Sequence, residues 1–97
     1  MASSVLNKPT VVIRTVQSAD TTLTINDAPT SSFYLIFFSV GETMGLYTTR
    51  AISTGSGTVR AVIPHDSVSS ITLSNKTLTV NATTSSFKVV QIMAFAL

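Results

Sequence analysis

Cysteine and tryptophan are absent from this chain of 97 residues, and histidine occurs once. Without cysteine there is no disulfide, no thiolate zinc site and no thiol nucleophile, so packing alone or a partner must hold the core. His65 and the four acidic residues are spread along the chain without the spacing of a metal site. We therefore expect no bound metal and no cofactor.

Charged residues are also scarce, at 10% of the chain against roughly 25% in an average globular domain. The six basic residues do not cluster, which argues against a nucleic-acid surface. No apolar run approaches the roughly 18 residues of a membrane span, and the first residues lack the basic and apolar segments of a secretory signal. We expect neither nucleic-acid binding nor a membrane span.

The chain does contain a repeated segment. Residues 22–26 read Thr-Leu-Thr-Ile-Asn, and a polar loop then leads to an apolar run that opens with Ser-Ser-Phe33. Residues 77–81 read Thr-Leu-Thr-Val-Asn, and a loop one residue shorter leads to Ser-Ser-Phe87 and a second apolar run. Such self-similarity indicates a duplicated structural unit. If the two copies are equivalent, we predict that Phe33 and Phe87 occupy equivalent positions in the core.

Short runs of β-branched and apolar residues alternate with turn residues, and no stretch has a helical period. The predicted strands are residues 10–17, 22–26, 33–40, 46–52, 58–63, 68–73, 77–81 and 87–95. We expect the first two to form one hairpin and 68–73 to form another with 77–81, around Asn75, which tolerates a positive φ. This pattern predicts an all-β chain, either a small antiparallel β-sandwich (jelly-roll-like) or a barrel of about eight strands.

The domain organisation that follows is simple. Residues 1–9 are polar and end in proline, which indicates an N-terminal arm or linker. Residues 10–97 then form a single β domain, with repeat halves at about 10–53 and 57–97.

The two long strands, 33–40 and 87–95, are apolar on both faces. A sandwich buries only the inner face of each sheet, so the second face needs another cover. Leaving three or four large side chains exposed would forgo several kcal/mol, at roughly 1.5–3 kcal/mol each. We predict that one face packs against another subunit, through Tyr34, Ile36, Phe38, Val90 and Ile92. The alternative is a small barrel that closes around both faces.

Enzyme chemistry has little support in the sequence, and we expect a non-enzymatic chain. His65 and Asp66 lie in a Pro-His-Asp-Ser turn, and no serine has the Gly-x-Ser-x-Gly context of a hydrolase nucleophile, although a small hydrolase based on His65 stays open. Loops at the ends of a β scaffold commonly bind ligands. The candidate ligand-binding residues are Tyr47, which could stack on a sugar, and Arg50, His65 and Asp66.

The stretch ITLSNKTLTVNATTSSFKVVQIMAF resembles the terminal domains of bacteriophage tail-fibre, baseplate and related virion appendage proteins. Chains of that group often end in a strand, a short turn, a Thr-Leu-Thr-Val-Asn strand, a loop and an apolar strand, as residues 68–97 do here. The resemblance implies a structural protein of the virion, a homotrimer that contacts other virion proteins and binds a host-surface glycan as receptor. The alternative is a carbohydrate-binding, lectin-like module of a larger extracellular protein.

Overall fold

The computed structural model describes residues 11–17, 21–84 and 87–96, so the predicted arm at residues 1–9 and the loop at 18–20 lie outside the described residues. The strands are β1 Val11–Gln17, β2 Thr21–Thr24, β3 Ser32–Val40, β4 Thr43–Ala51, β5 Arg60–Ile63, β6 Val68–Ser74, β7 Thr77–Ala82 and β8 Val89–Ala96. All eight predicted strands are confirmed, with ends that differ by up to three residues.

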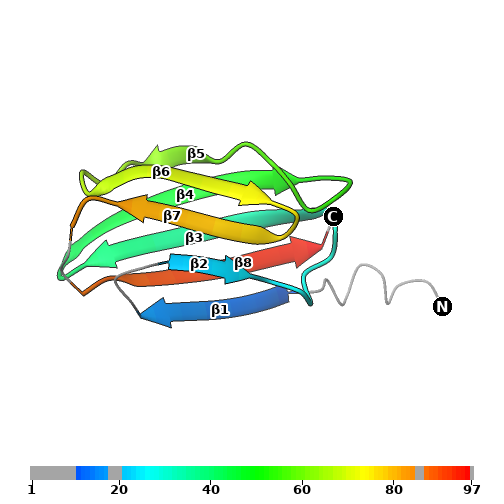
Figure 1. Cartoon of the computed structure of the whole chain (residues 1–97), viewed down its shortest axis with the longest axis horizontal. Helices are drawn as coiled ribbons and strands as arrows, with labels where there is room; N and C mark the ends of the chain where they lie inside the picture. The colour runs from blue at the N-terminus through cyan, green and yellow to red at the C-terminus, as the bar shows by residue number, and fades with distance from the viewer. Residues whose placement is uncertain (1–10, 18–20, 85–86, 97) are drawn as a thin grey trace.

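The strands form two antiparallel sheets that pack face to face. The larger sheet has five strands in the order β1-β8-β3-β4-β5, and the smaller has three in the order β2-β7-β6. The three-stranded sheet lies across β8, β3 and β4 of the larger one (Figure 1). Both sheets keep free edges, so the predicted sandwich is confirmed and the alternative of a closed barrel is not formed.

The two predicted hairpins had different outcomes. The first is wrong, because β1 pairs with β8 while β2 lies in the other sheet and pairs with β7. The second is confirmed: β6 and β7 pair around Asn75 and Lys76, whose φ values of 51° and 63° fit a two-residue type I′ turn. The sequence Ser-Ala-Asp at 18–20 offers neither the glycine nor the asparagine that favours such a turn.

The repeated segments are paired with each other across a pseudo-two-fold axis. β2 pairs with β7, which places Leu23 opposite Leu78, and β3 pairs with β8 in the same antiparallel sense. Each copy of the repeat therefore contributes one strand to each sheet. The core positions predicted for Phe33 and Phe87 are wrong, because these side chains are 52% and 64% exposed.

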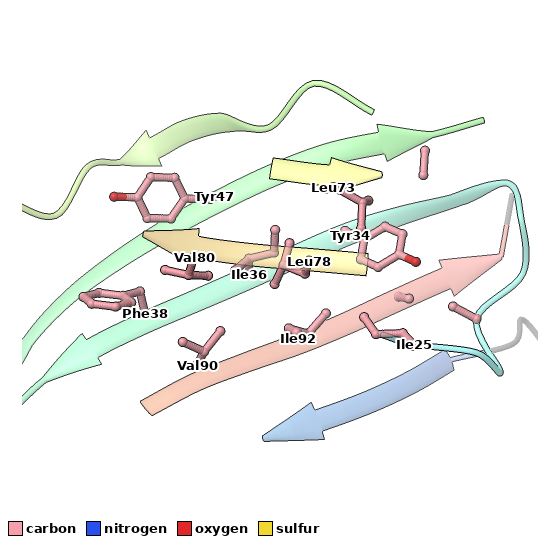
Figure 2. Close-up of a cluster of buried hydrophobic side chains, with 13 residues drawn as sticks. Ile25, Tyr34, Ile36, Phe38, Tyr47, Leu73, Leu78, Val80, Val90 and Ile92 are labelled. Atoms are coloured by element: carbon pink, nitrogen blue, oxygen red, sulfur yellow. The ribbon is translucent and has the colours of Figure 1, made fainter. Parts of the chain in front are cut away.

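The hydrophobic core lies between the two sheets (Figure 2). The even-numbered residues of β3 and β8 face it, and residues of β6 and β7 cover them from the smaller sheet. The buried apolar residues are Ile25, Ala28, Tyr34, Ile36, Phe38, Tyr47, Ala51, Leu73, Leu78, Val80, Val90, Ile92 and Ala94. At roughly 1.5–3 kcal/mol for each large side chain, their burial is the main term that holds the sheets together.

The loop between β4 and β5 ties the two sheets at one end. The Gly57 N–H donates to the Leu73 carbonyl at 3.3 Å, and the Lys76 N–H donates to the Gly55 carbonyl at 2.9 Å. Gly55 has a φ of +79°, and a Cβ added there would lie 2.5 Å from Lys76 Cγ. Glycine is therefore needed for the loop to reach the β6–β7 hairpin.

Candidate functional site

The outer side of the five-stranded sheet is apolar over most of its described area. The residues that form this surface, called here the apolar face, are Phe33, Leu35, Phe37, Met44, Leu46, Met93 and Phe95. Strand register joins them into rows: Phe33 lies beside Phe95, and Leu35 lies beside Met93. Contiguous exposed apolar surface of this kind marks an interaction site, because monomeric proteins seldom leave it uncovered.

Several side chains of this region are open to solvent. Met44 is 60% exposed, and Val62 and Ile63 on the edge strand β5 are 58% and 53% exposed. β5 is the shortest strand of its sheet and is exposed along its whole length, and its register with β4 shifts next to Leu46. The apolar surface therefore continues from the apolar face to a free sheet edge.

A groove of about 660 Å³ lies at the end of the apolar face where β3 begins. Phe33, Leu35 and Phe95 form its apolar wall, and Arg50 and Arg60 form its charged side. Arg50 is in register with Phe33, and both arginines are exposed. Neither arginine has a carboxylate partner among the residues described. The groove thus has an apolar wall on one side and unpaired positive charge on the other.

The predicted interface residues Tyr34, Ile36, Phe38, Val90 and Ile92 do not belong to the apolar face. Each of them is at most 1% exposed and lies in the core between the two sheets (Figure 2). The prediction that these five side chains contact another subunit is therefore wrong, because this chain's own smaller sheet already covers them. The opposite faces of the same two strands carry the apolar surface that is still uncovered.

Three of the four predicted ligand-binding residues lie together at the opposite end of the sandwich from the groove. The Tyr47 hydroxyl accepts a hydrogen bond from the His65 backbone N–H at 2.8 Å. His65 Nδ1 accepts from the Ser67 N–H at 3.0 Å, so the neutral ring carries its proton on Nε2. Nε2 then donates to Thr43 Oγ1 at 2.7 Å, and this hydroxyl donates to the Val40 carbonyl at 2.7 Å.

These contacts make His65 a clasp between the β3–β4 turn and the β5–β6 connection. Its ring also packs edge-on against Phe38, with ring centroids 4.9 Å apart. The Thr43 hydroxyl gives its proton to a carbonyl and not to the imidazole, which is the reverse of an activated nucleophile. Tyr47 is only 6% exposed, so its ring is not available to stack on a sugar. Asp66 is exposed beside the clasp, whereas Arg50 lies at the far end of β4.

The outer side of the three-stranded sheet has the opposite character. Its residues, called here the hydroxyl face, are Thr22, Thr24, Ser70, Thr72, Ser74, Thr77 and Thr79. Thr24 and Thr77 share a hydrogen bond of 2.9 Å between their hydroxyls, and Asn81 Nδ2 donates to Ser70 Oγ at 2.9 Å. The hydroxyls of this face hydrogen-bond to one another or to water, so the face does not need to be buried against a partner.

One polar atom of the core has no hydrogen-bond partner. Tyr34 is 1% exposed, and its hydroxyl is the one buried side-chain atom without a partner in the described part of the chain. Burial raises the pKa of Tyr34 above its ordinary value, because the phenolate would lose its hydration. Tyr34 is also among the residues that line the groove, but its hydroxyl is buried in the core.

The fold and its surfaces define an open antiparallel β-sandwich with one apolar and one hydroxyl-bearing outer face. Within residues 11–17, 21–84 and 87–96, no three acidic or histidine side chains gather as metal ligands, and no helix is long and apolar enough to cross a membrane. Comparison with protein-family models, with curated proteins and with solved structures found no match to this chain. The chemistry of the two outer faces and of the groove is therefore the basis on which a function can be proposed.

Proposed function

We propose that this chain is a non-enzymatic structural module that assembles with copies of itself through the apolar face. The observation that carries the proposal is the exposure of large side chains such as Phe33 and Met44 on the outer side of the larger sheet. Covering three or four of them would contribute several kcal/mol, at about 25 cal/mol for each Å² of apolar surface buried. This gain is comparable with the whole stability of a small domain.

The assembly we have in mind is a virion appendage, such as a bacteriophage tail fibre or baseplate. The support is the resemblance of residues 68–97 to the terminal domains of such proteins, together with a low content of charge and a surface rich in hydroxyls. In this setting the chain would contact other virion proteins through the apolar face and edge strand β5. Its loops would be the region that meets a host-surface receptor.

The self-association is tested by light scattering coupled to size exclusion, on the parent and two matched variants. Phe37→Asp places a charge in the middle of the apolar face, and Thr79→Asp places the same charge in the middle of the hydroxyl face. We expect the parent and Thr79→Asp to be oligomeric and Phe37→Asp to be a folded monomer, with folding checked by circular dichroism. A parent that is monomeric at micromolar concentration would overturn the proposal.

The virion location is tested separately. Mass spectrometry of purified virus particles, released from cells that encode this chain, should detect it in amounts comparable with those of known appendage proteins. Particles that lack the chain while the lysate contains it would refute the virion location and leave the self-association untouched.

A further inference from the structure

The apolar face carries opposite charges at its two ends. Arg50 lies in register with Phe33 at the end where β3 begins, and Arg60 lies one strand further out, in register with Thr48. Glu42 lies at the other end, in the turn that joins β3 to β4. All three charged residues are exposed, and none of them forms an ion pair within the part of the chain described. The surface is apolar in the middle, basic at one end and acidic at the other.

These charges are placed symmetrically along the chain. Arg50 follows Leu46 by four residues, and Glu42 precedes Leu46 by four. Leu46 forms a row across the sheet with Phe37 and Gln91. At about 3.3 Å per residue, each charge lies roughly 13 Å from this row. A rotation of 180° about an axis along the row would therefore exchange the basic end with the acidic end.

The size of the surface also suits a second copy. Strands spaced by about 4.8 Å and rising about 3.3 Å per residue give the five-stranded sheet an area of roughly 600 Å². Stable interfaces begin at about 600 Å² for each partner. Two sheets that pack face to face cross at about 30°, which displaces charges 13 Å from the axis by roughly 6 Å sideways. This displacement is within the reach of an arginine side chain.

We propose that two copies stack their apolar faces with antiparallel strands, about a two-fold axis along the row of Phe37, Leu46 and Gln91. Arg50 of each copy then faces Glu42 of the partner subunit, with Arg60 beside it. This inference rests on the proposed function, since it specifies the geometry of the self-association. It gives a closed, isologous dimer in place of the trimer that the resemblance implies. A parallel stacking would place the basic ends of the two copies together, where like charges repel.

The orientation is tested with single cysteine variants, because the chain has no cysteine of its own. Gln91 lies on the proposed axis, so the thiols of Gln91→Cys face each other and a short bis-maleimide should link two chains. The thiols of Phe33→Cys lie roughly 26 Å apart in this arrangement and should stay unlinked. Thr79→Cys, on the hydroxyl face, is the control and should also stay unlinked.

The charge pairing is tested by reversal. Arg50→Glu and Glu42→Arg should each raise the dimer Kd, measured by analytical ultracentrifugation, by about 10-fold or more, because each places like charges together. The double variant should return to within about 3-fold of the parent, since it restores opposite charges. Lys76→Glu changes the net charge equally on the smaller sheet and should leave the dimer Kd unchanged.

The outcomes separate this inference from the proposed function. If Phe37→Asp yields monomers while Phe33→Cys is linked as readily as Gln91→Cys, the apolar face is the interface but the antiparallel pairing is wrong. A mass of three chains, or a double charge variant as weak as the single ones, would also overturn the pairing alone. A monomeric parent would overturn both.

Discussion

The outer faces of the two sheets differ in chemistry, although strands of the same repeat form them. On the five-stranded sheet the outward residues are mainly Phe, Leu and Met, and on the three-stranded sheet they are Thr and Ser. Both sheets bury their inner sides in one core. Hydroxyls are well hydrated and large apolar side chains are not, so only the larger sheet gains from a second cover.

This difference is already present within each copy of the repeat. In β2 and β7, threonine alternates with apolar residues, so one face is apolar and packs in the core and the other is polar and faces water. In β3 and β8 both faces are apolar, so one face is buried in the core and the other is left without a cover from this chain's own smaller sheet. The polarity of a strand's two faces can therefore indicate whether one or both of them favour burial, even when no motif indicates a function.

The largest expected effect is a difference in folding between lysine substitutions at two neighbouring residues of β3. Ile36→Lys places an ammonium group in the core, where a buried charge costs several kcal/mol, and should leave the chain unfolded at 25 °C. Phe37→Lys places the same group on the partly exposed apolar face, so the chain should still fold. Circular dichroism and thermal unfolding compare the two. Equal behaviour of the variants would mean that the inner and outer faces have been assigned incorrectly.

A smaller effect is expected at the clasp between the β3–β4 turn and the β5–β6 connection. His65→Ala removes the hydrogen bonds to Ser67 and Thr43 and should lower the free energy of unfolding by about 1–3 kcal/mol. His65→Asn keeps an acceptor near the position of Nδ1 and should retain part of that stability. Urea denaturation measures both losses. A larger loss in the asparagine variant than in the alanine variant would contradict the role given to Nδ1.

The unpaired hydroxyl of Tyr34 gives a third test, on the core side of the larger sheet. Tyr34→Phe removes a buried polar atom that has no partner in the described ranges, and should raise the free energy of unfolding at pH 7 by about 1 kcal/mol. Urea denaturation at neutral pH measures the change. A clear loss of stability would show that the hydroxyl is bonded after all.

The same variant should alter the response to alkaline pH. The pKa of Tyr34 is raised by burial, so the unfolded chain releases this proton at a lower pH than the folded chain does. The contribution of neutral Tyr34 is therefore complete below pH 10 and is lost as the pH rises through the folded-state pKa. Stability curves from pH 8 upward should fall less steeply for Tyr34→Phe than for the parent. Parallel curves would count against the burial of this group.

The smallest effect on stability is expected for substitutions on the hydroxyl face. They are also the most direct way to remove the difference in polarity between the two outer faces. Thr77→Val combined with Thr79→Val keeps the side-chain shape and should change the free energy of unfolding by less than about 0.5 kcal/mol. It should nevertheless create new association, because the second outer face becomes apolar. Light scattering measures the mass, and the matching serine variants serve as controls. No gain in mass would show that the apolar character of a face is not sufficient for assembly.

The sequence was enough to predict the strands and an antiparallel sandwich or barrel, but not which face of each long strand lies in the core. Both faces of β3 and β8 are apolar, so alternation alone does not say which is inside. A signal was nevertheless present in Gln91, the one polar residue of β8, which shares its face with Met93 and Phe95. A polar side chain in mid-strand is costly to bury and marks the outer face. This residue would have identified the apolar face correctly.

The errors in pairing have a different origin. A short connection favours a hairpin, but β1 is the edge partner of β8, and this pairing depends on contacts far away in the sequence. The hairpin at Asn75 could be predicted because its turn needs positive φ at both central residues, which is a local property. The position of Arg60 beside Thr48 likewise depends on the register between β4 and β5, which is not a local property.

The position of β8 has a consequence for the way the chain is made. β8 lies between β1 and β3 in the finished sheet, and its nearest register pair with β1, Gln17 with Val89, spans 72 residues. During synthesis β1 therefore has no partner, and one edge of β3 stays unpaired, until residues 89–96 leave the ribosome. Pairings of such long range form slowly, and exposed strands aggregate in the meantime. We expect the nascent chain to need chaperones, and a chaperone-depleted translation extract that yields soluble, folded product would show otherwise.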